Sequence, residues 1–355
     1  MRYTNMDRKD NAKMGTVDIS EDFINSLSST VLKKLLQDHS KSSKTYVSIF
    51  WATDNYRRLG PDYAYHMPIK PELITGKHGK VVQPRVVKSK VVQIARSKNM
   101  AEVFTPSWVC NKQNNLIDEN WFGRKGVFNI EIDVEDGSHC WKTTDSPIQF
   151  SKEKDWTSYV CENRLEVTCG EAPYVVSRYD ATTGECIPVK NRIGILDRKL
   201  RVVGENTKTK KEWLEWAENA YKATYGFEWQ GDNLLLAREA LLISLLDYYN
   251  EKFPNDELDV DVLERFAEII SWNFWQMDGL KGVVPDSCEE SVSRELDLFG
   301  GETITKTICE GCAKGNIRKH NGIYCKIKDW QEIDPRTKKH GKIVKFVDVL
   351  KKNGV

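Results

Sequence analysis

The pattern of apolar and polar residues in the first hundred positions predicts one helix, followed by strands and turns. The helix is expected to begin at Asp18, because Asp18 and Glu21 have the spacing of a capping box. Its apolar positions recur every four residues, at Phe23, Leu27, Val31 and Leu35. A polar run over residues 38–44 ends the helix, and residues 46–51 have the clearest strand pattern of the segment 45–98.

Strand and helix patterns alternate from about residue 101 to about residue 280. Strands are predicted at Arg164–Thr168 and Gly226–Trp229, and helices at 213–225, 232–249 and 260–271. The middle helix turns six leucines inward: Leu234, Leu235, Leu241, Leu242, Leu245 and Leu246. Such alternation is typical of a doubly wound α/β sheet, so a Rossmann-like fold is expected for this core. One more strand or short helix is predicted at 343–350.

The segment between residues 70 and 98 is strongly basic. It carries one acidic residue, Glu72, against eight cations: Lys70, Lys77, Lys80, Arg85, Lys88, Lys90, Arg96 and Lys98. Two interpretations follow from this composition. The segment is either a solvated, extended connector or an arm that contacts DNA phosphates.

The whole chain, in contrast, is nearly neutral. Its 355 residues carry a formal net charge of +1, so any contact with DNA must come from a local patch. The first residues lack the apolar stretch of a signal peptide, and no segment approaches the roughly 20 apolar residues that a membrane span requires. We therefore expect a cytoplasmic location without membrane contact, with the nine cysteines reduced or bound to metal.

Four short motifs follow one another in the predicted core. The first is Ala101-Glu-Val-Phe-Thr-Pro106, which predicts a helix start with Thr105 as N-cap and Pro106 as the first helical residue. A helix N-terminus offers unpaired N–H groups and partial positive charge, which suit a carboxylate ligand. Capping without any ligand is the alternative interpretation.

The second motif, residues 165–172, is a strand with an acid, followed by a turn of small residues. Glu166 is placed to accept a hydrogen bond from an ammonium group, and a turn without bulky side chains lets a ligand lie against the main chain. The turn consists of Cys169, Gly170, Glu171 and Ala172. A strand and turn that bind no ligand would give the same pattern.

The third and fourth motifs also end in acids. Glu228 closes Tyr225-Gly-Phe-Glu228 at the carboxyl edge of the predicted sheet, where doubly wound folds bind ligands. A carboxylate there can accept hydrogen bonds from both hydroxyls of a ribose, and Trp229 can stack on a base. In the fourth motif, Asn273-Phe-Trp-Gln-Met-Asp278, the acid is Asp278. Each acid, taken alone, is more often a cap or a surface charge.

In this order the four motifs resemble the cofactor-binding half of the gamma-class adenine-N6 DNA methyltransferases of restriction-modification systems. The resemblance implies S-adenosylmethionine (SAM) as cofactor, with Asp278 accepting a hydrogen bond from its adenine amino group. The implied cofactor-binding residues are Phe104, Thr105, Pro106, Glu166, Cys169, Gly170, Glu171, Ala172, Glu228, Trp229 and Asp278. One departure is Ala172, which stands where the family usually has a second glycine.

The resemblance does not extend to the catalytic loop. In the family this loop is Asn-Pro-Pro-Tyr or a close variant, and it holds the adenine that has been flipped out of the duplex. None of the eleven prolines here is followed by another. We therefore expect no catalytic residue in this chain and a companion subunit that supplies the loop and the target-recognition domain. The other implied partners are double-stranded DNA and, where the system carries one, a restriction endonuclease.

The cysteines of the segment 286–330 indicate a second kind of site. Cys309-Glu-Gly-Cys312 has the spacing of a metal knuckle, with Cys288 before it and Cys325 after it. Four thiolates favour a structural Zn²⁺ ion, and His320 is the substitute ligand if one cysteine is not used. The alternative is four unrelated core thiols.

The predicted chain has four regions. Residues 1–98 form an N-terminal helix and a basic extended region, 99–285 the SAM-binding core, 286–330 the zinc-bearing insert, and 331–355 a C-terminal tail. The companion is expected to dock on this tail by extending the sheet along residues 343–350. Three functions stay open: the SAM-binding subunit of a split methyltransferase, a catalytically inactive SAM-binding regulatory protein, and a zinc-bearing DNA-binding module.

Overall fold

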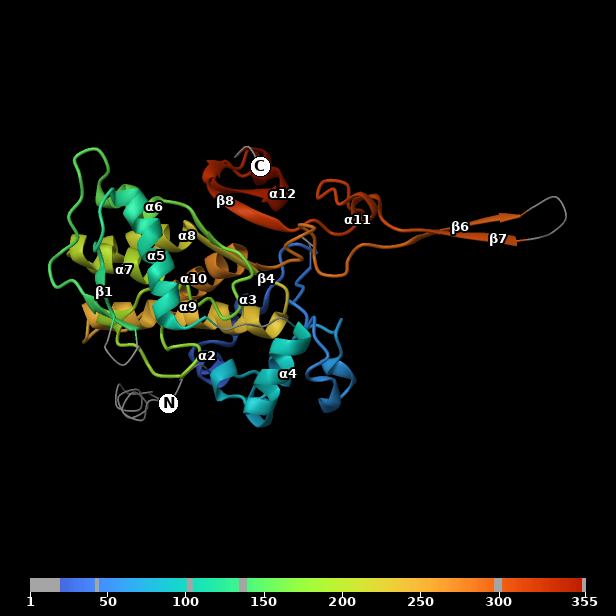
Figure 1. Ribbon diagram of the computed structural model, residues 1–355, viewed down its shortest axis with the longest axis horizontal. Coiled ribbons are helices and arrows are strands. Elements are labelled where there is room, and N and C mark those ends of the chain that lie inside the picture. The colour runs from blue at the N-terminus through green and yellow to red at the C-terminus, as the bar shows by residue number, and fades with distance from the viewer. Residues whose placement is uncertain (1–19, 42–44, 101–104, 134–138, 297–301, 353–355) are drawn as a thin grey trace.

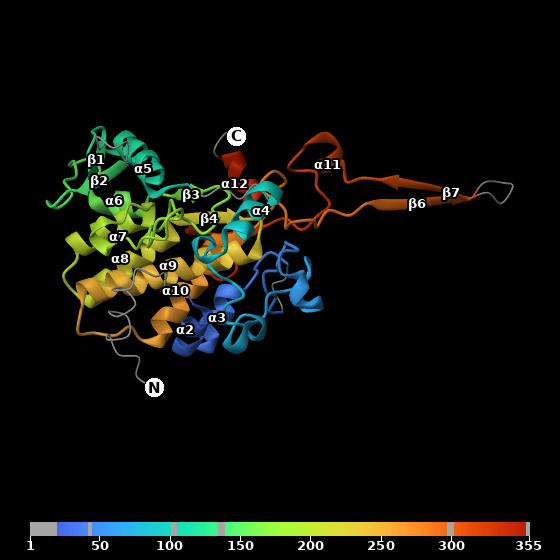
Figure 2. The same ribbon diagram turned by 60° about the horizontal axis from the view of Figure 1, so that its bottom comes forward.

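The computed structural model describes residues 20–41, 45–100, 105–133, 139–296 and 302–352 (Figure 1). Helices surround a short parallel sheet, and a two-stranded ribbon projects from one end of the molecule. The same arrangement seen after rotation confirms that the ribbon extends away from the helical body (Figure 2).

Two helices, not one, begin the described part of the chain. α2 (Glu21–Leu27) and α3 (Ser29–Leu36) are separated at Ser28, whose backbone is extended. Ser20 caps α2 by accepting a hydrogen bond from Phe23 N–H, and Ser28 caps α3 in the same way. The prediction of one continuous helix was wrong at this point, because a serine that can cap a new helix outweighs the apolar repeat. Asp18 lies outside the described residues.

Residues 45–89 contain turns and five single-turn 3₁₀ helices. These are η1 (Arg57–Leu59), η2 (Pro61–Tyr63), η3 (Pro71–Leu73), η4 (Gly76–His78) and η5 (Arg85–Val87). The strand predicted over residues 46–51 is reduced to isolated bridges, of Ser48 with Gln37 and of Phe50 with Pro68.

Helix α4 (Lys90–Met100) lies within the basic segment, where an extended connector was one of the two interpretations. The extended interpretation was wrong for these residues. The stretch contains no glycine or proline, so nothing in its sequence interrupts a helix.

In the described part of the chain, the core is built around a sheet of three parallel strands. β3 (Arg164–Glu166), β4 (Thr224–Glu228) and β5 (Phe274–Gln276) lie side by side in that order. Helices α7 (Ile195–Asn206) and α8 (Lys210–Lys222) connect the first two, and α9 (Gly231–Lys252) and α10 (Val260–Asn273) connect the second pair. The α/β prediction and both predicted strands are confirmed at this level. β3 is shorter than predicted, because Thr168 adopts a left-handed backbone with φ of 51°.

Helix α9 is buried along most of its length, and it carries a buried arginine. Arg238 donates hydrogen bonds to the carbonyl oxygens of Leu35 and Phe274 and, at 3.1 Å, of Ser271. These carbonyls lie at the ends of α3 and α10, where backbone acceptors lack partners within their own helix. One guanidinium therefore joins three helices and the start of β5.

Helix α5 (Ser107–Phe122), a hairpin and a short helix lie on the side of α7 that faces away from α9 (Figure 2). The hairpin pairs β1 (Asn129–Asp133) with β2 (His139–Thr143), and the short helix is α6 (Trp156–Cys161). The N-terminal end of α5 lies beside the segment that follows β3, where Ser107 N–H donates to Asp180.

The C-terminal part of the chain contains two separate antiparallel pairs. β6 (Ser291–Leu296) pairs with β7 (Glu302–Thr307), and β8 (Lys326–Ile333) pairs with β9 (His340–Lys345). Helix α11 (Glu310–Lys314) lies between the pairs, and α12 (Phe346–Lys352) ends the described chain.

Residues 343–350, predicted as a strand or short helix, comprise the end of β9 and most of α12. They do not extend the β3–β4–β5 sheet, because β9 pairs with β8. Phe346 is buried against Phe227 of β4 and Trp275 of β5. The tail thus covers one face of the central sheet.

Candidate functional site

A cavity of about 1030 Å³ opens at the carboxyl ends of β3 and β4. Its lining comes from β3 and the loop after it, the end of β4, the starts of α7 and α9, the last turn of α4, and α5 with the residue Thr105 before it. Of the residues predicted to bind a cofactor, those that line it are Thr105, Glu166, Cys169, Gly170, Glu171, Glu228 and Trp229. Residues far apart in the sequence are therefore brought to one place, at the strand ends where parallel sheets bind ligands.

Glu228 links the end of β4 to the loop that follows β3. Its carboxylate accepts a hydrogen bond from Gly170 N–H at 2.9 Å and another from Gln230 N–H at 3.1 Å. The first bond crosses from the end of β4 to the loop after β3. Burial raises the pKa of the Glu228 carboxyl, although these backbone donors act in the opposite direction.

Glu166 is the second acid of the cavity, and one of its oxygens is not engaged. Oε2 is buried and has no hydrogen-bond partner among the described residues. Burial raises the pKa of Glu166 well above its ordinary value, and repulsion from Glu228 raises it further. A buried carboxylate oxygen without a partner is costly, so this position favours a ligand that donates a hydrogen bond or carries positive charge.

The loop after β3 owes its shape to three residues with left-handed backbone. Thr168, Gly170 and Ala172 have φ of 51°, 55° and 60°. Only glycine adopts this conformation without strain, so Thr168 and Ala172 are held there by the surrounding structure. Ala172 is fully buried and does not line the cavity. The predicted turn is present. Ala172, which stands in the place of the family's second glycine, packs in the core beneath the turn.

Glu171 lines the cavity but its carboxylate is engaged by the protein. One oxygen accepts a hydrogen bond from Tyr179 hydroxyl at 2.6 Å, and the other accepts one from Arg85 N–H at 2.7 Å. The Arg85 bond links the basic segment to the cavity loop. Glu171 is therefore a structural support of the loop.

The predicted helix start at Thr105 is shifted by one residue. Pro106 is the N-cap of α5 and makes no side-chain capping bond. Ser107 N–H, the first of the helix, donates to Asp180 Oδ2 at 2.7 Å. The carboxylate that this N-terminus was expected to receive is thus already supplied, in part, by Asp180. Phe104 lies outside the described residues.

Asp278 does not line the cavity. Its Oδ1 accepts hydrogen bonds from the N–H groups of Leu280 and Lys281, at 3.0 and 3.2 Å. Its Oδ2 is 3.1 Å from the Lys281 ammonium nitrogen. A short aspartate with two following N–H groups within reach closes a turn, and this local use accounts for the residue.

Several cavity residues escaped the sequence analysis. Gln113, Asn114 and Ile117 come from one side of α5, and Gln230 and Asn233 come from the start of α9. The spacing of the α5 group, three to four residues apart, is the signal that could have found it.

Arg96 of α4 connects the basic segment to the start of α9. Its guanidinium lies 2.8 Å from Asp232 Oδ2 and 3.2 Å from Asn233 Oδ1, and it is only 2% exposed. Lys88 Nζ lies 3.8 Å from the same Asp232 oxygen. Burial would raise the pKa of Asp232, but these two cations lower it. Arg96 and Lys88 therefore face the protein interior, where DNA phosphates do not reach.

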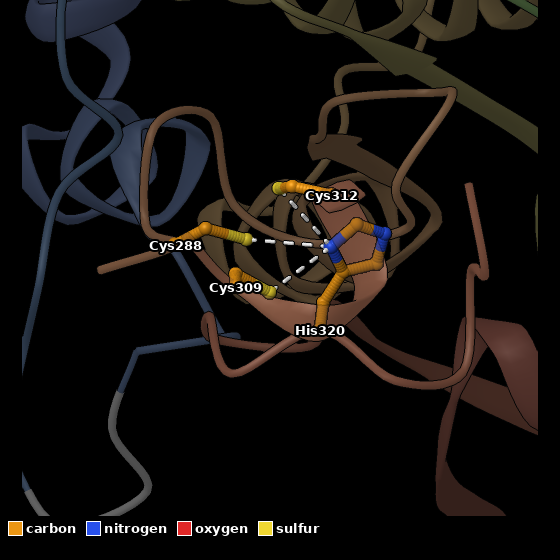
Figure 3. A group of neighbouring side chains, drawn as sticks. All are labelled: Cys288, Cys309, Cys312 and His320. Carbon is orange, nitrogen blue, oxygen red and sulfur yellow. Dashed lines mark hydrogen bonds between the residues drawn. The ribbon is translucent and has the colours of Figure 1, made fainter. Parts of the chain in front are cut away.

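The second candidate site is a cluster of three cysteines and a histidine (Figure 3). Cys288 precedes β6, Cys309 is the N-cap of α11, Cys312 lies within α11 and His320 follows it. The four donor atoms lie within 4.8 Å of one another. The three sulfur atoms are 3.5, 3.6 and 3.6 Å from His320 Nδ1.

These separations fit a tetrahedral metal ion. With a metal–sulfur distance of about 2.3 Å and a metal–nitrogen distance of about 2.0 Å, tetrahedral angles place sulfur and nitrogen about 3.5–3.6 Å apart. The Cys309 sulfur also accepts a hydrogen bond from Asn321 N–H at 3.2 Å, which stabilises a thiolate. The cluster could therefore hold a zinc ion.

Gly311 makes the close approach of His320 possible. A Cβ atom at this position would lie 2.6 Å from His320 N and 2.7 Å from its ring. No real side chain tolerates such distances, so the glycine inside the Cys309–Cys312 pair has a steric reason.

Cys325, predicted as the fourth ligand, is not part of the cluster. It is fully buried with Phe227 and Trp275, and its thiol donates to the Gln276 carbonyl oxygen at 3.3 Å. His320, the substitute named from the sequence, lies where the fourth ligand is needed. The reason is a contact between distant parts of the chain: Tyr324 forms a bridge with Val283, and the next residue, Cys325, donates to Gln276 of β5.

Comparisons of the chain with protein-family models, with curated proteins and with solved structures found no match. Within the described residues, no helix has both the length and the apolar character that crossing a membrane requires. The chemistry of the cavity and of the metal cluster is therefore inferred from their own residues.

Proposed function

We propose that this chain is the SAM-binding subunit of a split adenine-N6 DNA methyltransferase, and that SAM binds in the cavity at β3 and β4. The observation that carries the proposal is the placement of two acids, Glu166 and Glu228, at the carboxyl ends of adjacent parallel strands around one cavity. SAM presents an ammonium group and two ribose hydroxyls, all of them donors. A Rossmann-like assignment belongs to the same proposal, because successive parallel strands that lie side by side form half of such a sheet.

The ammonium group and the ribose hydroxyls of SAM each have a candidate acceptor in the cavity. The unpartnered Oε2 of Glu166 suits the ammonium group, because charge and hydrogen bonding are both satisfied there. Glu228 suits the ribose hydroxyls, since its carboxylate has acceptor capacity beyond its two backbone bonds. Trp229 lines the cavity, and its ring suits the adenine. No role is proposed for Asp278.

Methyl transfer requires a second group of residues. The adenine N6 must form a bond to the methyl carbon while the carbon–sulfur bond breaks and N6 loses a proton. Holding the two atoms in line can contribute several kcal/mol to the rate enhancement. The chain has no Pro-Pro dipeptide with which to build the family's adenine-holding loop. A companion subunit is therefore proposed to bring that loop and the target-recognition domain to double-stranded DNA.

The metal of the cluster is proposed to be zinc. Three sulfurs and one imidazole nitrogen form a closed tetrahedral set, which suits Zn²⁺ and leaves no position for a reacting molecule. The role is then structural. The ion would join the two ends of the segment that carries β6 and β7.

Calorimetric titration with SAM tests the cavity. Wild-type protein should bind SAM, and Glu228→Ala should bind about 30-fold more weakly or worse, since two bonds to a charged group are worth about 2–4 kcal/mol. Asp278→Ala is the matched control, because this acid is equally buried but does not line the cavity. Equal weakening by both variants, or no heat with wild type, would count against the proposed pocket.

Transfer of tritium from labelled SAM to DNA tests the activity. The companion to use is the product of a neighbouring reading frame that carries an Asn-Pro-Pro-Tyr loop. Activity is expected from the mixture and from neither chain alone. Robust activity from this chain by itself would refute the split enzyme. A stable but inactive mixture that still binds SAM would favour the regulatory protein.

A further inference from the structure

The ribbon of β6 and β7 projects away from the rest of the described chain (Figures 1 and 2). Six residue pairs, from Ser291 opposite Thr307 to Leu296 opposite Glu302, hold its two strands together. No third described strand pairs with either one. Both outer edges of the ribbon therefore carry backbone N–H and C=O groups that pair with no other strand among the described residues.

Such a ribbon is not stable by virtue of its own pairing. An isolated two-stranded hairpin is marginal in water, and natural proteins usually cover or blunt exposed strand edges. Free edges of this kind are a common mode of protein recognition, in which a strand of the partner adds to the sheet through main-chain hydrogen bonds.

The base of the ribbon, in contrast, is firmly held. Two of the four cluster residues lie at this base: Cys288 precedes β6 and Cys309 follows β7 in the sequence. Asn321 adds a second clamp: its side chain accepts a hydrogen bond from Glu289 N–H at 3.1 Å and donates one to the Glu289 carbonyl oxygen at 2.8 Å. These contacts tie the base of the ribbon to the loop that carries His320 and Asn321.

The charge of the ribbon segment argues against DNA as the partner that binds the ribbon edges. Between Cys288 and Cys309 there are five acidic and two basic residues, a net charge of −3. This charge repels DNA phosphates and disfavours edge-to-edge pairing with a second copy of the chain. It complements a protein with basic side chains beside an extended strand.

We propose that the β6–β7 ribbon is the docking arm for the companion subunit, which adds a strand with basic flanks to a ribbon edge, and that the metal cluster fixes the direction of the arm. The inference rests on the proposed function only in naming the companion as the partner. It places the contact on the ribbon, away from residues 343–350.

A shortened ribbon tests this directly. Val292 and Lys306 are paired in register, so residues 293–305 can be replaced by Asn-Gly, the turn that connects two paired residues most readily. All four cluster residues stay in place. Affinity for the companion, measured by biolayer interferometry, should fall by at least about tenfold, while SAM affinity and zinc content should not change.

A variant of unchanged length tests whether the acidic charge of the ribbon contributes to companion binding. Glu295→Lys with Glu302→Lys should weaken companion binding and reduce its dependence on salt. The matched control is Glu215→Lys with Glu257→Lys, two exposed acids of the helical body, which should leave companion binding unchanged.

Each outcome bears on the proposal. Unchanged companion affinity of the shortened protein would overturn the docking arm and leave the split enzyme intact. No companion binding by wild type, with SAM binding retained, would overturn both the arm and the split enzyme but not the pocket. If the shortened protein loses duplex DNA binding but keeps companion binding, the ribbon binds DNA instead. If wild type self-associates and the shortened protein does not, the ribbon binds a second copy of the chain.

Discussion

The metal cluster allows a quantitative test, because the structure and the sequence motif disagree about the fourth ligand. His320→Ala removes a residue whose Nδ1 lies 3.5–3.6 Å from all three sulfurs. Cys325→Ala removes the residue that the motif had suggested and that lies in the core instead. Each variant deletes one predicted ligand.

The expected magnitude follows from the ligand set. Structural zinc in small domains binds with about 10–16 kcal/mol, so one ligand of four accounts for roughly 2.5–4 kcal/mol. Zinc affinity of His320→Ala should therefore fall on the order of 10²- to 10³-fold. Cys325→Ala should keep wild-type zinc affinity and lose about 1–2 kcal/mol of folding stability, the cost of one small cavity in a packed core.

The assay is competition for zinc with a chromophoric chelator, together with metal analysis of protein never exposed to chelator. Wild type and Cys325→Ala should each retain about one zinc per chain after competition, whereas His320→Ala should release it. Release from Cys325→Ala with retention by His320→Ala would refute the assigned ligand set. A wild type without any metal would refute the site itself.

Three further predictions concern the cavity and the knuckle. Glu228→Gln keeps the shape of Glu228 but can accept only one of the two backbone bonds with its amide oxygen, so SAM should bind about 10- to 100-fold more weakly by calorimetry. SAM affinity should rise as pH increases above the ordinary carboxyl range, because the raised pKa values of Glu166 and Glu228 delay the formation of their negative charges. The unliganded protein should become less stable over the same interval, because its native state there binds more protons than its unfolded state. An affinity that falls with pH would contradict this. Gly311→Ala should weaken zinc binding at least about tenfold in the chelator assay, whereas Gly204→Ala in α7, where a Cβ meets nothing within 4 Å, should raise the melting temperature slightly.

Some elements of the fold and of the cavity follow from local sequence patterns. The strands that carry Glu166 and Glu228 were recognisable because short apolar runs ended in acids, and parallel strands bring such ends together. The turn after β3 was recognisable from Gly170, because glycine adopts the left-handed backbone found there without strain.

Two site residues, the fourth ligand of the cluster and Asp278, were not predictable from the motifs. Cys325 and His320 have equally plausible spacing to the Cys309–Cys312 pair, and only the pairing of Val283 with Tyr324 decides which of them faces the cluster. Asp278 has the right place in the motif order, but its carboxylate is used by the two N–H groups that follow it. For Asp278, therefore, a short-range turn and not its place in the motif order decides the role of the side chain.

The ion pair of Arg96 with Asp232 has a consequence for how this protein can change during evolution. Asp232 is fully buried at the start of α9, and its charge is balanced by cations from the basic segment. A fragment beginning at residue 99 would leave this acid uncompensated, at a cost of about 3–5 kcal/mol. The N-terminal region therefore cannot be exchanged between related chains as an independent module unless the acid or its balancing cations are inherited together with it.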